Sequence, residues 1–530
     1  MAWVGFAADG REYLTVLEGN QRTPAPWANV IANPTFGFIV STDGSGFTWS
    51  VNSQQNTITP WSNDAVSDPP GEILYIRDED TGEVWGPTAL PIRERNAPYT
   101  VAHGQGYTRF EHVSHGIALE MVQFVAKDDP IKISRLKISN RSGRARRLSV
   151  TAYVEWVLGA NRSATQSTIV TEVDTQTGAI FAHNPWHEQF GERVAFCDLG
   201  GKQTAWTCDR TEFLGRDGAL DAPRALAPGA ILSNKSGAGL DPCGVLQTPV
   251  RLTATGSTEI VFTIGQTASD AESRALVAKY RQADFDAVFK ELGQAWDETL
   301  NAVRIKTPDR ALDILMNRWL PYQVLVCRVW ARTGFYQASG AYGFRDQLQD
   351  VMALCISRPE IAREHILRAA GRQFPEGDVQ HWWLPESGRG IRTRMSDDRA
   401  WLAYVTAHYV NTTGDFAILD ETVPFIEGPV LQEGEHDAFF EPTISEKRAR
   451  SVRPLRACAR QESDHGQTRL AAHGDRRLER WHGPRRLRTA KAKACGWAGS
   501  STPRFCRSRV LRKSAMATST RQNGALLLQH

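Results

Sequence analysis

The sequence predicts an α+β protein of several domains, in which a large antiparallel β-sandwich is followed by a helical region and a basic tail. At 530 residues the chain is long enough for roughly two to four domains with sizeable cores. Short runs that alternate apolar and polar residues fill the first half, and apolar residues at helical spacing begin near residue 269. These two patterns place the sandwich first and the helices second.

The predicted sandwich spans residues 1–268. Segments 132–138 and 148–154 show the alternation of half-buried strands, and Gly, Pro, Asn and Asp separate such runs throughout the region. Because many strands precede any convincing helix, we expect one antiparallel sandwich rather than alternating βαβ units. Most of the tryptophans in its loop-rich parts are expected to fill the core: Trp27, Trp49, Trp61 and Trp85.

Residues 269–303 are predicted to form a helical linker, because Ala, Glu, Leu, Lys and Gln are frequent there and apolar residues recur at helical spacing. Residues 304–445 are predicted to form a helical toroid whose connecting loops meet at one mouth and carry the chemistry. Helices are expected at 309–332, 347–357, 359–373 and 397–413.

The charge changes abruptly near residue 446. Residues 446–530 hold 21 Lys and Arg against 5 Asp and Glu, which leaves 41 against 54 in the acidic remainder. A basic tail usually suggests a nucleic-acid-binding arm. This tail has no base-stacking pattern and no signature of a nucleic-acid-binding fold, so we expect no nucleic-acid partner.

Composition also limits the compartment and the cofactors. No apolar run approaches the roughly 18 residues of a membrane-spanning helix, and the N-terminal residues do not resemble a signal peptide, so the expected location is cytoplasmic. Five of the eight cysteines lie before the basic tail, and they lack the paired spacing of zinc ligands, which argues against a metal site and fits a reducing compartment: Cys197, Cys208, Cys243, Cys327 and Cys355.

Residues 335–350 carry the most informative mixture of side chains. Aromatic rings can cover the apolar face of a sugar, and four polar side chains offer donors and acceptors that match vicinal hydroxyls: Arg345, Asp346, Gln349 and Asp350. An Arg–Asp pair at the start of a helix can also be a simple cap with a local ion pair.

Two further predicted loops favour the sugar-binding interpretation. Residues 378–385 contain His381, Trp382 and Trp383, and residues 388–398 end with Asp397 and Asp398. A histidine alone is more often structural than catalytic. Three such loops within about 65 residues nevertheless indicate a carbohydrate cleft.

These motifs resemble a known family. Tyr-Gly-Phe-Arg-Asp followed by Gln-Asp, then Gln-His-Trp-Trp and Ser-Asp-Asp, is similar to glycoside hydrolase family 94, the inverting β-glucan and disaccharide phosphorylases, and within it to the phosphorylase-like region of cyclic β-1,2-glucan synthases. The resemblance covers residues 1 to about 445. It implies a β super-sandwich, linker helices and an (α/α)6 barrel, with a β-glucan or oligosaccharide as substrate, inorganic phosphate as co-substrate and no cofactor.

The resemblance also implies roles for single residues. Arg345 and Asp350 would hold the hydroxyls of the glucosyl unit that is cleaved, and Trp382 or Trp383 would line the cleft. The family's general acid belongs to a later Gly-Asp-Trp-Asn-Asp motif, and its phosphate-binding residues come later still. Neither occurs in this sequence, so no catalytic residue is expected in frame and the barrel is incomplete.

The missing motif lies in another reading frame. Residues 476–485, Arg-Arg-Leu-Glu-Arg-Trp-His-Gly-Pro-Arg, can be encoded so that a shift of one nucleotide gives Gly-Asp-Trp-Asn-Asp-Gly-Met-Asp-Arg. We therefore predict a frameshift near residues 445–452, a second near residue 488, and a disordered, out-of-frame tail at 446–530.

Two other functions stay open. A non-catalytic protein would bind a carbohydrate and release no product. An inverting hydrolase would need an acid and a base in frame, which leaves Asp346, Asp350, Asp378, Asp397 and Asp398 as candidates.

Overall fold

A computed structural model describes residues 3–450 of the chain. The chain divides into two compact units, the first ending at Ala341 and the second beginning at Tyr342. The division therefore falls inside the 335–350 segment and beyond the predicted linker. The predicted tail is described only as far as residue 450, and the rest of it lies outside the described residues.

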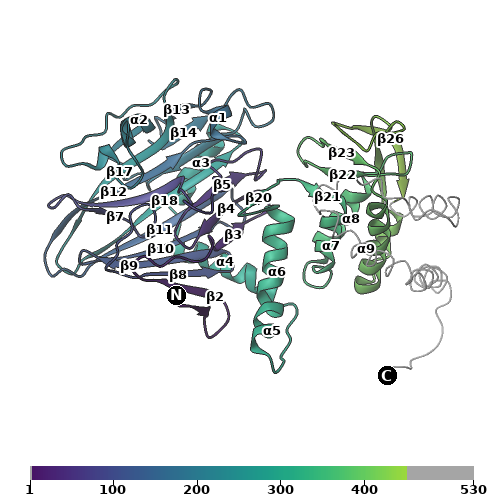
Figure 1. The fold of residues 1–530 in the computed structure, drawn as a ribbon, viewed down its shortest axis with the longest axis horizontal. Helices are drawn as coiled ribbons and strands as arrows, with labels where there is room; N and C mark the ends of the chain where they lie inside the picture. Colours follow the sequence, from purple (N-terminus) through teal and green to yellow (C-terminus); the bar gives the residue numbers. More distant parts are fainter. Residues whose placement is uncertain (1–2, 451–530) are drawn as a thin grey trace, which may run out of the picture. The chain divides into compact units, whose positions relative to one another are not determined.

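The first unit is built on antiparallel sheets (Figure 1). A ten-stranded sheet has the order β1 (Trp3–Phe6), β2 (Glu12–Leu17), β8 (Tyr99–Gly104), β9 (Tyr107–Ser114), β10 (Ile117–Val125), β11 (Ile131–Asn140), β18 (Ser257–Thr267), β15 (Val194–Asp198), β14 (Ile180–His183) and β13 (Val170–Val173). A five-stranded sheet has the order β16 (Ala205–Asp209), β17 (Pro242–Leu252), β12 (Arg146–Glu155), β6 (Glu72–Asp78) and β7 (Val84–Trp85). A three-stranded sheet contains β3 (Ala28–Ala32), β4 (Phe36–Ser41) and β5 (Gly46–Ser50).

The core of this unit lies between the sheets. Ile76, Leu136 and Val150 are fully buried in one cluster that takes side chains from all three sheets, and each large apolar side chain removed from water contributes about 1.5–3 kcal/mol. The predicted antiparallel sandwich is confirmed. Of the four tryptophans expected in the core, Trp49 and Trp85 are buried, whereas Trp27 and Trp61 are only partly buried.

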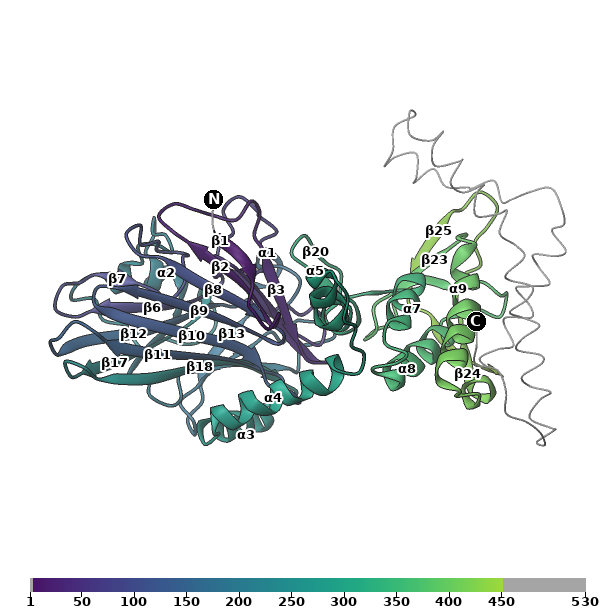
Figure 2. The ribbon, with the colours of Figure 1, turned by 90° about the horizontal axis from the view of Figure 1, so that it is seen from below.

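The predicted linker consists of two helices, α3 (Asp270–Arg281) and α4 (Phe285–Leu300), which run along the sandwich (Figure 2). Ser269 caps α3 by accepting a hydrogen bond from the backbone N–H of Glu272, and Asp284 caps α4. The short helices α1 (Arg162–Thr165) and α2 (Arg210–Leu214) lie in connections of the sandwich.

The helix predicted at 309–332 is present but irregular. It starts as α5 (Arg310–Ile314), continues through a π-helical turn at Leu315–Trp319 and α6 (Leu320–Gln323), and ends in π-helical turns at Val324–Trp330. Pro321 has no N–H to donate and its ring crowds the preceding turn, which accounts for the wider turns around it.

The second unit combines helices with small sheets. Helices α7 (Phe344–Met352), α8 (Pro359–Ala370) and α9 (Asp397–Thr413) pack on one another. One sheet has the order β21 (Tyr342–Gly343), β22 (Gln380–Trp383), β23 (Gly390–Thr393) and β25 (Asp437–Phe440), and β24 (Thr422–Glu427) pairs with β26 (Thr443–Arg450). The fold class, an antiparallel β domain followed by a helical region, is confirmed.

Two details of the prediction were wrong in the second unit. The segments expected as loops at 378–385 and 388–398 contain strands β22 and β23, and α7 begins at Phe344 rather than at residue 347. Strands this short carry no readable alternation. The partners β21 of β22 and β25 of β23 each lie about forty or more residues away in sequence, so pairing rather than local sequence determines these strands. No helix among residues 3–450 is long and apolar enough to cross a membrane.

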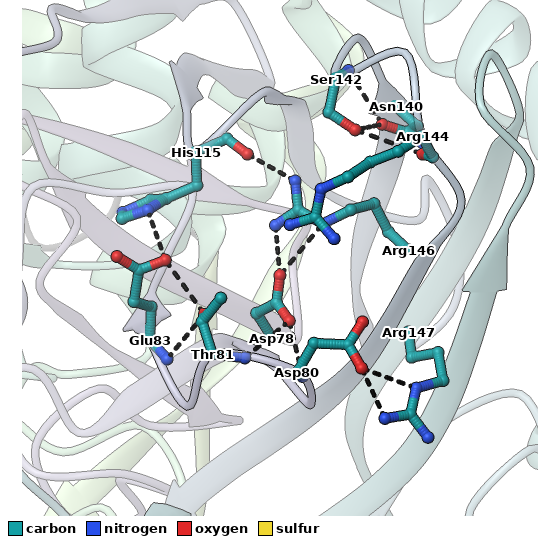
Figure 3. A network of polar contacts seen from close by, with 10 residues as sticks. All are labelled: Asp78, Asp80, Thr81, Glu83, His115, Asn140, Ser142, Arg144, Arg146 and Arg147. Atoms are coloured by element: carbon teal, nitrogen blue, oxygen red, sulfur yellow. Dashed lines mark hydrogen bonds and ion pairs between the residues drawn. The ribbon is translucent and has the colours of Figure 1, made fainter.

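A buried ion pair connects two strands of the five-stranded sheet (Figure 3). Asp78 ends β6 and Arg146 begins β12; their side chains are 0% and 3% exposed, and Nε of Arg146 donates to Oδ2 of Asp78 at 3.0 Å. Nη1 of Arg146 donates to the carbonyl of His115 at 2.6 Å. Burial opposes ionisation of Asp78, but hydrogen bonds from the backbone N–H of Asp80 and from Arg146 outweigh it and lower the pKa of Asp78.

Replacing Asp78 by Asn is expected to destabilise the first unit by about 3 kcal/mol or more, because the Arg146 charge then stays buried without a counter-charge. Urea unfolding at neutral pH measures the change. The lowered pKa of Asp78 means that its contribution is present above the ordinary Asp pKa and is lost as the pH falls through the native value. The difference between the two proteins should therefore shrink in acid.

Asp80→Asn is the matched control. Asp80 lies two residues after Asp78 and pairs with Arg147, which is next to Arg146 on β12 but exposed (Figure 3). This substitution should change the stability little. Equal effects of the two substitutions would show that burial of the Asp78 pair is not what matters.

Candidate functional site

Strand β22 brings three distant segments of the second unit together. It pairs with β21 through Gly343 and Trp382 and with β23 through Ile391 and Trp382. Helix α7 begins directly after β21, and α9 begins four residues after β23. The first turns of both helices therefore lie beside β22, although about fifty residues separate them in sequence.

A β-bulge in β22 changes which side chains face outward. The register with β23 shifts between Gln380 and Trp382, so His381 is the extra residue. Gln380 and Trp383 are buried, whereas His381 and Trp382 between them are both partly exposed. Strict alternation would place these two neighbours on opposite faces. The bulge instead leaves an imidazole and an indole side by side on the accessible side.

Gly390 makes this pairing possible. A Cβ at this position would lie 2.1 Å from the carbonyl oxygen of Trp382 on the neighbouring strand, closer than any side chain can approach. A glycine is therefore required where β23 passes the bulge.

Arg345, in the first turn of α7, is held by three partners. Its Nη1 donates to Oδ2 of Asp397 at 2.7 Å, its Nε donates to Oε1 of Gln349 at 2.9 Å, and its guanidinium lies 5.2 Å from the ring centre of Trp401. The side chains of Arg345 and Asp397 nevertheless remain 46% and 51% exposed. The guanidinium is thus oriented in advance and still reachable by a ligand.

His381 forms the second polar pair of the site. Its Nδ1 lies 2.6 Å from Oδ2 of Asp398, whose side chain is 1% exposed while that of His381 is 33% exposed. The hydrogen bond to Asp398 raises the pKa of His381. Burial raises the pKa of Asp398, and the bond from His381 opposes that change. Oδ1 of Asp398 is shielded from solvent and accepts no hydrogen bond from the described part of the chain.

The remaining predicted residues lie in or near the same turns. Asp346 is exposed and its carboxylate folds back over Gly343, where a Cβ would lie 2.1 Å from Oδ2. The negative charges of Asp346 and Asp397 both raise the pKa of His381 through space. Gln349 and Asp350 follow on α7 and are partly buried.

The two tryptophans differ in position. Trp383 is fully buried, with its ring centre 5.9 Å from that of Tyr342 and 5.3 Å from the Arg372 guanidinium. It belongs to the interior of the second unit, and its place in the lining of a cleft stays a prediction. Trp382 is partly exposed and packs on Phe439 at 5.6 Å, so it can offer part of a ring face to a ligand.

Asp378 has a structural role. Both of its carboxylate oxygens accept hydrogen bonds from the buried Arg392, each at 2.7 Å. This pair closes the turn before β22 onto β23 and leaves Asp378 a poor candidate for an acid or a base.

The sequence points to His381 but gives it no role in the site, because nothing in the sequence shows that Asp398 would reach it. Trp401 is not predicted. The signal that could have found both residues is position: each belongs to, or directly follows, a segment that already held a predicted site residue.

The site thus gathers an arginine and an imidazole that donate, carboxylates that accept, and a partly exposed indole. Side chains of these kinds can match the hydroxyls and one ring face of a sugar. The chain belongs to the glycosyl hydrolase 94 family: the model of its supersandwich domain matches residues 11–283, and that of its catalytic domain superfamily matches residues 295–445. The predicted resemblance is confirmed.

Relatives of known name agree with this family. The chain is 45% identical over 443 residues to the cyclic beta-(1,2)-glucan synthase NdvB of Rhizobium meliloti, a match that covers 84% of the chain and 16% of that protein. It is 31% identical over 442 residues to solabiose phosphorylase of Paenibacillus borealis (81% and 55%), and 26% identical over 459 residues to N,N'-diacetylchitobiose phosphorylase of Vibrio furnissii (80% and 56%). The chain spans only part of the length of each relative.

Replacing Asp398 by Asn should lower the pKa of His381, because the largest influence that raises this pKa is the hydrogen bond to Asp398. A pH titration of the imidazole ring protons by NMR measures it. In the native chain the His381–Asp398 pair stabilises the fold most at pH values below the ordinary pKa of histidine. This contribution is lost as the pH rises through the raised pKa of His381.

Asp397→Asn serves as the control, because Asp397 acts on His381 only through space. Its effect should be smaller. If both variants shift the titration equally, the His381–Asp398 hydrogen bond does not set the pKa of His381.

Proposed function

We propose that this chain is the sugar-binding part of a β-glucan phosphorylase-like protein, related to the phosphorylase-like region of cyclic β-1,2-glucan synthases. The glucosyl unit next to the scissile bond would be bound by Arg345, Asp346, Gln349, Asp350, Trp382, Asp397 and Asp398. The observation that carries the proposal is the Arg345 guanidinium, oriented by Asp397 and Gln349 but half exposed, within the part of the chain that matches the catalytic domain.

The proposed chemistry is transfer of the glucosyl unit to phosphate with inversion. Phosphate is already an anion and a nucleophile, so a single carboxylic acid that protonates the leaving oxygen suffices, whereas an inverting hydrolase needs a base as well. Arg345 would donate to sugar hydroxyls and the carboxylates beside it would accept from them, which fixes the sugar ring for in-line attack. The residues that hold phosphate in the family are not found in frame in this sequence.

We further propose that the chain as written binds its glucan and does not cleave it, because the general-acid motif is out of frame. Two points support this: the family match ends at residue 445, and residues 476–485 can be encoded so that a shift of one nucleotide gives Gly-Asp-Trp-Asn-Asp. A cytoplasmic location is part of the proposal and rests on the thiols, because the five cysteines of the described residues are free.

A purely carbohydrate-binding role is the second candidate. It is favoured by the same site, which needs no acid to hold a sugar. An inverting hydrolase is a weaker candidate, because Asp378 is committed to Arg392 and Asp397 to Arg345. Inverted free glucose, released from a β-1,2-glucan without phosphate, would support the hydrolase instead.

Arg345→Ala is expected to weaken binding of β-1,2-linked glucose oligosaccharides by about tenfold or more, since a hydrogen bond to a charged group contributes about 1.5–3 kcal/mol. Titration calorimetry with sophorose and the full chain measures the change. Arg144→Ala is the control, because Arg144 is exposed on the turn between β11 and β12. Unchanged binding in Arg345→Ala would remove the basis of the proposal.

Sequencing the gene across codons 440–530 should reveal Gly-Asp-Trp-Asn-Asp in a second frame. The protein as written should release no glucose 1-phosphate from these oligosaccharides and phosphate, and the protein with its frame restored should release it. DNA that cannot encode the motif in any frame would refute the frameshift. It would not affect the binding proposal, which is tested separately by Arg345→Ala.

A further inference from the structure

Three ligating side chains meet at the edge of the ten-stranded sheet, in the first unit. Glu172 lies on the edge strand β13, His183 ends β14, and Asp270 is the first residue of α3. Val170 is paired with His183, so Glu172, two positions along, presents its side chain on the same face as His183. Three separate elements thus bring an imidazole and two carboxylates to one point.

The distances suit a shared cation better than hydrogen bonds. Nε2 of His183 lies 3.7 Å from Oε1 of Glu172 and 3.8 Å from Oδ1 of Asp270, and the three ligand atoms all lie within 4.8 Å of one another. These separations are too long for hydrogen bonds. Two ligands that each lie about 2.1 Å from one metal ion are roughly 3–4 Å apart, as observed here.

Oδ1 of Asp270, one of the three ligand atoms, is shielded although its side chain is 44% exposed. It has no contact with solvent and accepts no hydrogen bond from residues 3–450. A shielded carboxylate oxygen requires a partner, which a cation or a bound water can supply. The ring nitrogens of His183 likewise form no hydrogen bond within the described part of the chain, so the imidazole is available as a ligand.

An imidazolium bridging two carboxylates is the competing explanation. Charge-assisted pairs of this kind close to about 2.7–2.9 Å. In the same molecule His381 and Asp398 do so at 2.6 Å, whereas His183 stays a full ångström further from both of its carboxylates. A gap of the same size on both sides is what an ion between them would produce.

We propose that Glu172, His183 and Asp270 bind a first-row divalent cation, with Zn²⁺ preferred, and that water completes its coordination. One imidazole with two carboxylates suits Zn²⁺ or Mn²⁺ better than Ca²⁺ or Mg²⁺, which prefer oxygen ligands alone. The side chains of Glu172 and Asp270 are 52% and 44% exposed, so the ion has a path from solvent. The expectation of no metal site is based on the spacing of cysteines, which gives no information about a site made of histidine and carboxylates.

The cation would join the sheet edge to the start of the linker helix. Arg274, one turn along α3, acts on both carboxylates through space, but its Nε donates to Asp174 at 2.7 Å. Its positive charge lowers the affinity without occupying the ligand position. The result is a structural site of moderate affinity, independent of the sugar site in the second unit.

The test uses the full chain after treatment with a chelator. Titration calorimetry with ZnCl₂ should show one ion per chain, and Zn²⁺ should raise the temperature of unfolding of the first unit. His183→Ala and Glu172→Gln should each weaken binding at least about a hundredfold, because even residues behind the ligands are worth about ten- to a hundredfold. Co²⁺ should give the visible absorption of a site with a nitrogen ligand, lost in His183→Ala.

His436→Ala is the matched control, since His436 is exposed on another part of the chain. It should leave the affinity and the thermal shift unchanged. No one-to-one binding, or binding that survives both His183→Ala and Glu172→Gln, would overturn the proposal. Glu172→Gln keeps the size of an exposed side chain, so a loss of binding there cannot be attributed to misfolding.

Discussion

The pairing of β22 with a strand on each side is the constraint on which the candidate site depends. Arg345, His381 and Asp398 come from three segments: α7 and α9 pack on each other, but only β22 brings His381 to them. The backbone hydrogen bonds of β22 fix the starts of α7 and α9 beside it. The side-chain pairs Arg345–Asp397 and His381–Asp398 then close over that frame. The geometry of the site therefore depends on three short strands, β21, β22 and β23, of two to four residues each.

The sandwich also constrains the first part of the 335–350 segment, at Gly340. Gly340 lies in the left-handed region, and its carbonyl accepts hydrogen bonds from Asn52 at 3.0 Å and from Arg332 at 2.9 Å. A Cβ at Gly340 would lie 2.0 Å from Oδ1 of Asn52, so only glycine fits. What looks in the sequence like one sugar-binding segment is thus divided: its first part is held by the sandwich, and its second part belongs to the next unit.

The predictable parts of this structure are those in which local pattern and tertiary packing agree. The ten-residue strands β11 and β12 alternate over enough residues to be recognised, and α9 was predicted at its observed bounds. β21 and β22 were not predicted, because two to four residues carry no period and their partners lie elsewhere in the chain. The members of the site followed from residue type, but their pairing did not, since Asp398 reaches His381 only after β22 has formed.

Trp383 shows in a single residue why the sequence does not predict which side chains of the site are buried. Its neighbour Trp382 is chemically identical, and the sequence treats both alike. The face that each presents is decided by a register shift that no residue type announces. The family's general-acid motif and phosphate-binding residues are not found in frame in this sequence, so the proposed chemistry rests on the family and the proposed sugar site on geometry.

The bulge at His381 also determines what different mutations in this strand would do. Substitutions there change one side chain and leave the register intact. Deletion of a single residue between Gln380 and Trp383 would restore one-to-one pairing with β23 and leave Trp383 opposite Gly390 on the buried face, so it would remove the accessible pair of His381 and Trp382 without exposing the buried indole. The extra residue therefore serves the accessible face of the strand and not its buried face.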